Sequence, residues 1–179
     1  MLLVWEQTGT NPERKTCRLA AAQIAIESGL SSCLNYNISG IKARPNNGKT
    51  HWQYFKTTER FSPVQVVAAE KLGPGLVEVI GNDGDKIKVW IKPKHPYCCF
   101  RAFETLNDAM LDHLLTLKNK FPNGWLGLLT GDAGKFAHGL KIDGYYTAKE
   151  SDYDSGLEWR LKQELASVSD EHLVWGDVI

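Results

Sequence analysis

The stretch "RKTCRLAAAQIAIESGL", residues 14–30, is an apolar run that finishes on a carboxylate, a serine and a glycine. Four of its residues recur at the spacing of one helix face: Leu19, Ala22, Gln23 and Ile26. Asn11 is a favoured N-cap, Pro12 suits the first helical position, and Gly29 suits the position after the last turn. The sequence therefore predicts a buried helix over residues 12–27 that ends on Glu27.

Glu27 lies where an ionised carboxylate is disfavoured. The carboxyl end of a helix carries partial negative charge, and apolar neighbours such as Ile24 and Ile26 add desolvation. Both effects are expected to raise the pKa of Glu27. A carboxylic acid that stays protonated near neutral pH is what a glycosidase needs to protonate a leaving oxygen. The alternative is a solvated glutamate at a frayed helix end.

The composition is ordinary for a soluble globular domain. The chain has 179 residues, of which 42% are apolar, and its 21 basic and 21 acidic residues give a formal net charge of zero. This balance gives no electrostatic signature for nucleic acid or an acidic membrane surface. No apolar run approaches the roughly 20 residues of a spanning helix, and the N-terminus lacks the pattern of a cleaved signal peptide. We expect no nucleic-acid partner, no membrane insertion, and synthesis in the cytoplasm without a cleaved signal.

The remaining sequence segregates predicted strands from predicted helices. An Asn-, Ser- and Gly-rich loop region follows the first helix, and the β segments are a strand at residues 52–61 and a hairpin at residues 76–92. Three further helical segments are predicted, at residues 100–121, 131–146 and 150–166. The first is expected to stop at residues 122–124, and the second to end in a turn. This order predicts one α+β domain over residues 1–179, with a ligand cleft between a helical lobe and a β lobe.

Five short motifs occur in a fixed order along the chain: "AAQIAIESG" at 21–29, "YNISGIKA" at 36–43, "TTE" at 57–59, "FRAF" at 100–103 and "GYYTAKESDYDSGL" at 144–157. As a set they resemble the peptidoglycan-cleaving N-acetylglucosaminidases of glycoside hydrolase family 73. The resemblance implies a lysozyme-like α+β fold in which a helical lobe and a small β lobe flank a substrate cleft. It also implies hydrolysis of the β-1,4 bond between N-acetylglucosamine and N-acetylmuramic acid, without a cofactor.

The resemblance assigns a catalytic set of three residues. Glu27 matches the general acid of the family, and Glu59 matches a β-lobe carboxylate that acts as general base or electrostatic partner. Tyr145 matches a tyrosine that faces the substrate near the acid. Tyr153 matches a later tyrosine, to which we assign a structural role.

The chain departs from the family pattern in two regions. Residues 30–31 are Leu and Ser where the family has an aromatic residue and a glycine, which changes the local loop and not the acid. The segment at residues 61–97 is longer than the family pattern and fits a lid or a partner surface. It contains Glu70 and Glu78, which are alternatives to Glu59 as the second carboxylate.

Polar and aromatic side chains are candidates for binding the glycan, because sugar rings stack on aromatic faces and sugar hydroxyls take hydrogen bonds. The resemblance places Tyr36 and Asn37 at the start of a loop that lines the cleft, and Trp52, Tyr54 and Tyr146 complete the predicted substrate-binding set. Trp90 and Trp125 are further candidates, although each of these aromatic residues also fits a core position. Tyr146 enters the set because "GYYT" replaces the family's G-Y-A-T, so that Tyr145 and Tyr146 can exchange roles.

No metal site is predicted, since the five histidines lack H-x-x-x-H spacing and no C-x-x-C pair occurs. "LTGDAGKF" departs from a phosphate-binding loop at Leu129 and Phe136. The four cysteines fit either free, partly buried thiols or a disulfide made after export.

A wall hydrolase without a signal peptide suits a toxin injected into rival bacteria, for example by type VI secretion. It would act on peptidoglycan glycan strands in the target-cell periplasm, and a cognate immunity protein would occlude its cleft. A phage endolysin, a lytic transglycosylase and a glycan-binding module without activity are the alternatives.

Overall fold

The computed structural model describes residues 2–28, 34–43 and 51–164, and its fold class is α+β, as predicted. The chain divides into two compact units, which are described separately below. A helical unit consists of Met1–Ser39 with Glu104–Ile179, and a sheet unit consists of Gly40–Phe103. The prediction of a single domain over the whole chain stays a prediction.

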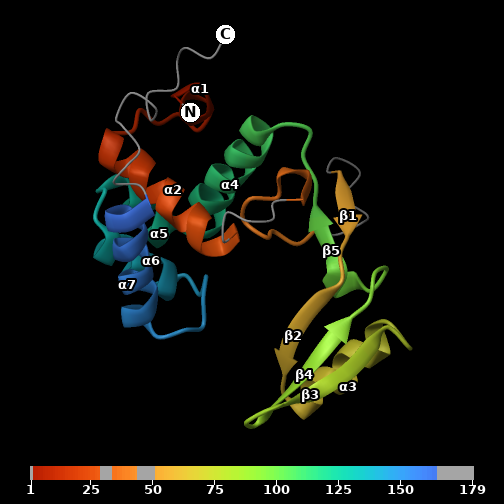
Figure 1. Cartoon of the computed structure of the whole chain (residues 1–179). Helices are drawn as coiled ribbons and strands as arrows, with labels where there is room; N and C mark the ends of the chain where they lie inside the picture. Colours follow the sequence, from red (N-terminus) through yellow and green to blue (C-terminus); the bar gives the residue numbers. More distant parts are fainter. Residues whose placement is uncertain (1, 29–33, 44–50, 165–179) are drawn as a thin grey trace. The chain divides into compact units, whose positions relative to one another are not determined.

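The helical unit is built from helices that lie around one apolar core (Figure 1). Its described elements are α1 (Leu2–Glu6), α2 (Arg14–Ser28), the 3₁₀ turn η1 (Leu34–Tyr36), α4 (Leu106–Lys120), α5 (Pro122–Leu129), α6 (Ala133–Ile142), α7 (Glu150–Trp159) and the π-helical turn η3 (Arg160–Glu164). Fully buried side chains from α2, α4, α5, α6 and α7 form the core: Leu19, Leu114, Leu117, Leu128, Phe136, Leu140 and Leu157.

Helix α2 starts two residues later than predicted. The backbone N–H groups of Thr16 and Cys17 donate to the carbonyl of Glu13, at 3.0 and 3.2 Å, so the first turn opens at Glu13 and not at Asn11. Its carboxyl end matches the prediction within one residue, because the helix runs to Ser28. The predicted stop at Gly29 and the departures at residues 30–31 lie outside the described residues.

The second predicted long helix is shorter than expected, and its predicted stop begins another helix. Thr105 caps α4 by accepting a hydrogen bond from the Asp108 N–H at 3.1 Å, so the helix starts at Leu106. Pro122 occupies the first position of α5. The N–H of Gly124 lies in that first turn and has no acceptor within the helix. It donates instead to the Asp143 carboxylate at 2.9 Å, so the cap comes from a residue 19 positions further along the chain.

Helices α5 and α6 pack closely because glycines line their contact. A Cβ on Gly127 would lie 2.5 Å from the carbonyl oxygen of Lys135, and one on Gly139 would clash with the carbonyl oxygen of Asn123. Trp125 of α5 is buried and stacks on Trp5, with ring centroids 5.5 Å apart. Its candidacy as a groove-lining residue is therefore wrong.

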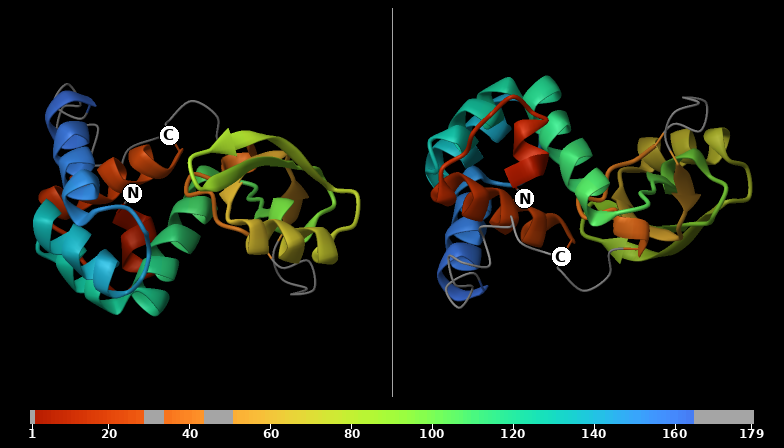
Figure 2. Two further views of the ribbon diagram at one scale, coloured as in Figure 1. Left: turned by 90° about the horizontal axis from the view of Figure 1, so that it is seen from below. Right: turned by 90° about the horizontal axis from the view of Figure 1, so that it is seen from above.

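The sheet unit contains two small antiparallel sheets and a helix. Its elements are β1 (Trp52–Tyr54), β2 (Thr57–Phe61), α3 (Pro63–Leu72), β3 (Val77–Asp83), β4 (Lys86–Ile91), the 3₁₀ turn η2 (Pro96–Cys98) and β5 (Cys99–Arg101). The predicted hairpin is confirmed as β3 and β4, and α3 lies along one face of it (Figures 1 and 2). The single strand predicted at residues 52–61 is two strands, since β1 pairs with β5 whereas β2 pairs with β4.

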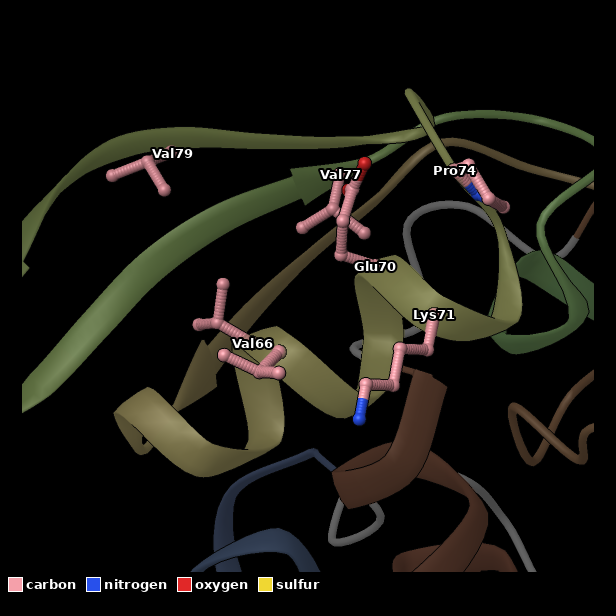
Figure 3. A pocket seen from close by; sticks show the side chains of 7 residues that line it. Val66, Glu70, Lys71, Pro74, Val77 and Val79 are labelled. Carbon is pink, nitrogen blue, oxygen red and sulfur yellow. The ribbon is translucent and has the colours of Figure 1, made fainter.

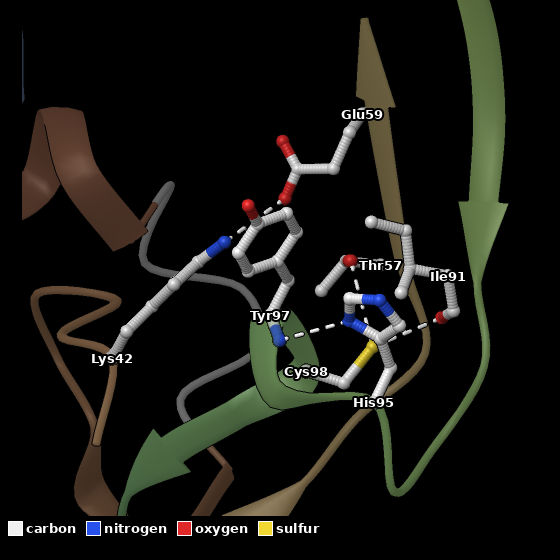
Figure 4. A network of polar contacts seen from close by, with 7 residues as sticks. All are labelled: Lys42, Thr57, Glu59, Ile91, His95, Tyr97 and Cys98. Carbon is white, nitrogen blue, oxygen red and sulfur yellow. Dashed lines mark hydrogen bonds and ion pairs between the residues drawn. The ribbon is translucent and has the colours of Figure 1, made fainter. Parts of the chain in front are cut away.

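Helix α3 was not predicted, although its start carries a local signal. Ser62 and Gln65 form a capping box, in which each side chain accepts a hydrogen bond from the other residue's backbone N–H. The imidazole of the buried His95 joins this helix to η2, because one ring nitrogen accepts from the Tyr97 N–H and the other donates to the Ala69 carbonyl. This contact fixes the turn that carries Tyr97 and Cys98 (Figure 4).

The cysteines that the structure describes are free thiols. Cys17, Cys98 and Cys99 are buried, and burial raises the pKa of Cys17 and Cys99. Cys33 lies outside the described residues. The alternative of a disulfide that includes one of these three residues is therefore wrong. Among the described helices, none combines the length and the apolarity needed to cross a bilayer.

Candidate active site

Glu27 lies in the last turn of α2 and belongs to a cluster of polar side chains inside the helical unit. Gln23 stands one turn earlier on the same helix, and the four-residue spacing places both side chains on one face. Gln23 is fully buried, whereas Glu27 is part-buried. The carboxyl group therefore sits at the edge of the core, where it keeps access to solvent.

Tyr145 reaches this cluster because of the turn that ends α6. Gly144 adopts a left-handed conformation, with φ of 73°, and the Tyr145 N–H returns to the carbonyl of Leu140 at 2.9 Å. The ring of Tyr145 packs edge-on against Phe121, with centroids 4.8 Å apart. The backbone turn and this aromatic contact fix the position of the hydroxyl.

Tyr153 reaches the same cluster from α7. It is buried and stacks in parallel on Tyr146, with ring centroids 4.1 Å apart and an interplanar angle of 6°. The hydroxyl of Tyr146 points elsewhere and donates to the Ala137 carbonyl at 2.9 Å. Of the two adjacent tyrosines, Tyr145 therefore carries the hydroxyl at Glu27, and Tyr146 supports the ring of Tyr153.

Short contacts join the four polar side chains. Tyr153 donates its hydroxyl to Glu27 Oε1 at 3.0 Å. The amide nitrogen of Gln23 lies 2.8 Å from the Tyr145 hydroxyl, 3.4 Å from Glu27 Oε1 and 3.5 Å from the Tyr153 hydroxyl. The Tyr145 hydroxyl also hydrogen-bonds to the Glu27 carboxyl group.

Burial dominates the electrostatics of this cluster. Desolvation raises the pKa of Glu27, and the hydrogen bonds from Tyr153, Tyr145 and Gln23 oppose that rise only in part. Desolvation and the adjacent Glu27 carboxylate raise the pKa of Tyr145 and Tyr153, so both hydroxyls stay protonated donors. The expected direction of the Glu27 pKa is confirmed.

The arrangement suits a proton donor. Glu27 Oε1 already accepts hydrogen bonds from Tyr153 and Gln23, which favours placing the acidic proton on Oε2. After that proton leaves, the three donors stabilise the carboxylate that remains. The cluster can therefore hold Glu27 as a neutral acid and then as its conjugate base.

Two predicted substrate-binding residues, Tyr36 and Asn37, belong to the same unit. Tyr36 is 46% exposed, and its backbone takes a left-handed conformation with φ of 55°. Asn37 follows it and is buried. Tyr36 thus presents an aromatic face to solvent, whereas Asn37 faces the protein interior.

The remaining predicted site residues belong to the sheet unit. Trp52 is 43% exposed and packs edge-on against the half-buried Tyr54, with centroids 5.2 Å apart. Trp90 is 36% exposed, and the Lys56 ammonium lies 3.2 Å from the centroid of its ring. Trp52 is thus the more exposed of these rings, and Lys56 covers one face of Trp90.

Glu59 lies in the middle of β2, opposite Val89 of β4. Lys42 forms an ion pair with it at 3.2 Å and reaches it alongside Tyr97 (Figure 4). The alternatives Glu70 and Glu78 are engaged elsewhere: Glu70 accepts from the Gly75 N–H at 2.7 Å, and Glu78 pairs with Lys92 at 3.1 Å.

The sheet unit also has an apolar hollow of about 540 Å³ between α3 and β3. Val66 of α3 faces Val77 and Val79 of β3 across it, with Glu70 and Lys71 at its border (Figure 3). The hollow does not contain Glu59, and its lining is mainly aliphatic. Within the described residues, no group of three or more His, Cys, Asp or Glu side chains is placed to hold a metal ion.

Comparisons with known proteins give one structural similarity. No protein-family model and no curated protein matches the chain. A crystal structure of a peptidoglycan hydrolase mutant from Sphingomonas sp. A1 is similar, with 22% identity and a TM-score of 0.47 over 91% of this chain and 94% of that one.

Sequence reasoning missed two members of the Glu27 cluster. Tyr153 was assigned a structural role, but its hydroxyl contacts the carboxyl group directly. Gln23 was placed on the buried face of the helix without a role, although its spacing from Glu27 was a usable signal, because residues four apart on a helix are neighbours.

Proposed function

We propose that this protein is a peptidoglycan hydrolase in which Glu27 is the general acid. The observation that carries the proposal is the part-buried Glu27 carboxyl group, whose pKa is raised by desolvation while three protein donors surround it. The order of the motifs, which resembles family 73 and its lysozyme-like fold, supplies the substrate class. The proposed substrate is the glycan strand of peptidoglycan.

In the proposed reaction, Glu27 transfers its proton to the glycosidic oxygen as the bond from that oxygen to the anomeric carbon breaks. The bond electrons go to the leaving oxygen, and Glu27 becomes a carboxylate. Tyr145 and Tyr153 then stabilise this carboxylate through hydroxyl groups that stay protonated. A low-dielectric surrounding strengthens these hydrogen bonds.

The proposed bond is the β-1,4 linkage between N-acetylglucosamine and N-acetylmuramic acid, cut within the strand by an endo-β-N-acetylglucosaminidase. Two routes complete the hydrolysis. Glu59 activates a water molecule, or the acetamido oxygen of the substrate attacks the anomeric carbon. In this structure the Glu59 carboxylate is paired with Lys42, so the first route requires this ion pair to open.

Digestion of purified sacculi tests the assignment. Glu27→Gln keeps shape and removes the transferable proton, and loss of a general acid costs about 10²–10⁴-fold in rate. Glu13→Gln is the matched control, because Glu13 is an exposed glutamate at the other end of α2, paired with Lys15. Glu59→Gln should lower the rate less than Glu27→Gln if the acetamido oxygen partly replaces it. A folded Glu27→Gln protein that digests sacculi at the native rate would refute the proposal.

A lytic transglycosylase is the second candidate. Within the described part of the helical unit, Glu27 is the one carboxyl group in the hydrogen-bonded cluster, which fits a reaction that needs a single protein carboxylate. Mass spectrometry of the products separates the two: hydrolysis leaves a reducing sugar end, and transglycosylation leaves an anhydro-sugar end. Binding to sacculi without any product would instead indicate a glycan-binding module.

We propose an antibacterial toxin as the biological role, delivered to the periplasm of rival bacteria, with a phage endolysin as the alternative. The zero formal net charge supports this role over a basic endolysin. Cys17, Cys98 and Cys99 are free thiols, so they give the toxin role no support in the form of a disulfide. A toxin of this kind needs an immunity protein in the producing cell, and a partner that covers Glu27 would block the reaction.

A further inference from the structure

Gln23 occupies an unusual position for an amide. It is fully buried in the middle of α2, and it lies one turn before the proposed acid. Its nitrogen contacts oxygens of three other side chains: the Tyr145 hydroxyl at 2.8 Å, the Glu27 carboxyl at 3.4 Å and the Tyr153 hydroxyl at 3.5 Å. The shortest of these contacts is to Tyr145, which comes from a different part of the chain.

The other end of the same amide is left without a partner. Gln23 Oε1 is buried and accepts no hydrogen bond from any residue that the structure describes. A buried carbonyl without a donor costs free energy, and an apolar side chain of the same shape would avoid that cost. Packing therefore does not account for glutamine at this position, but the contacts of its nitrogen do.

We propose that Gln23 is a positioning residue, which holds the Tyr145 hydroxyl and the Glu27 carboxyl group in the arrangement that the reaction needs. The inference rests on the proposed acid role of Glu27. Because the nitrogen donates to the Tyr145 oxygen, the hydroxyl proton of Tyr145 is directed away from Gln23 and toward Glu27. Gln23 thus acts on Glu27 directly and through Tyr145.

The proposal has a consequence for ionisation with a definite sign. The Gln23 hydrogen bond favours the carboxylate form and lowers the pKa of Glu27 against the larger effect of burial. The other groups at the carboxyl are Tyr153 from α7 and Tyr145 from the segment between α6 and α7. No charged side chain is among the described groups that shift Glu27. Removing the amide should therefore move the ionisation midpoint of Glu27 to higher pH.

Two substitutions separate positioning from packing. Gln23→Met keeps the length and removes the donor. Gln23→Glu keeps the shape and places a second carboxyl group beside Glu27, so that the two groups titrate as a coupled pair. The Glu27 midpoint should be higher in Gln23→Met than in wild type, and in Gln23→Glu the last proton of the carboxyl pair should leave at a higher pH than the Glu27 proton of wild type. The midpoint is read by carbon-13 NMR of the side-chain carboxyl groups, with Glu27→Gln identifying the Glu27 signal.

The rate of sacculus digestion is measured on the same samples. Gln23→Met should lower the rate about tenfold, the effect of one hydrogen bond on an activation barrier, while the alkaline limb of its pH profile moves up with the midpoint. A folded Gln23→Met protein with an unchanged Glu27 midpoint would overturn the proposal. If both variants at position 23 unfold, Tyr145→Phe removes the hydroxyl that Gln23 holds, and an unchanged midpoint in that variant overturns it as well.

The NMR readout needs no substrate, so it is independent of the proposed function. A wild-type protein that fails to digest sacculi refutes the acid role of Glu27, whatever the titration shows. A wild-type protein that digests sacculi, combined with an unshifted midpoint in Gln23→Met, refutes the role of Gln23 alone.

Discussion

Replacing Tyr153 by phenylalanine removes one hydroxyl from the proposed site and leaves the rest of the side chain. That hydroxyl donates to Glu27 Oε1 at 3.0 Å, while the ring stacks on Tyr146 at a centroid distance of 4.1 Å. The stack needs only the ring, so the position of α7 should be kept. The substitution therefore tests one hydrogen bond to the proposed acid.

The size of the effect follows from that bond. A hydrogen bond to a charged group contributes about 1.5–3 kcal/mol, and the part-buried contact places this one at the lower end. About 1.4 kcal/mol is a tenfold change in an equilibrium constant. Because Tyr153 stabilises the carboxylate, its loss should make Glu27 harder to ionise, with an ionisation constant about tenfold lower. The alkaline limb of the rate profile should move to higher pH.

The assay is the initial rate of sacculus clearing, measured from acid to alkaline pH for wild type and Tyr153→Phe. Melting temperatures of both proteins control for loss of structure. A folded variant whose alkaline limb stays in place, or moves to lower pH, would contradict the reasoning. A parallel profile for Tyr145→Phe shows whether the two hydroxyls contribute equally.

Two further predictions concern stability. Above the ordinary pKa of glutamate the unfolded chain has lost the Glu27 proton while the folded chain still holds it, so folding becomes less favourable as pH rises to the folded pKa. Glu27→Gln removes this penalty, so its melting temperature should exceed that of wild type at neutral pH, and the difference should vanish in acid, where both states of the wild type are protonated. Gly127→Ala should lower the free energy of unfolding by about 1–3 kcal/mol in urea titrations, because its Cβ would meet the Lys135 carbonyl at 2.5 Å, whereas Gly81→Ala, with open space around it, is the control.

Local patterns in the sequence were enough to predict several elements. The 3.6-residue spacing and the Gly29 stop predicted α2, with Glu27 in its last turn. The alternating runs around Gly84 predicted the β3–β4 hairpin, whose turn Gly84 enters with φ of 62°. These signals are contained in a few adjacent residues, so no distant contact is needed to read them.

Elements that depend on distant partners were not predictable in this way. Helix α5 starts at Pro122, and its N-cap residue Phe121 makes no side-chain cap, so an N–H of its first turn is satisfied by Asp143 from the end of α6. The run at residues 52–61 has aromatic and threonine content typical of a single strand, but it divides because its two halves pair with β5 and β4. Strand pairing is a tertiary choice that composition does not encode.

The candidate site shows the same division between local pattern and tertiary contact. The sequence by itself determined that Glu27 ends a buried helix and that its carboxyl group is disfavoured as an anion. The motif resemblance already placed Tyr145 near the acid, but only the tertiary structure brought the Tyr153 hydroxyl to Glu27, across 126 residues of the chain. The physical reason is that hydrogen bonds between side chains depend on distance and angle in space, which the packing of α2 against α7 sets.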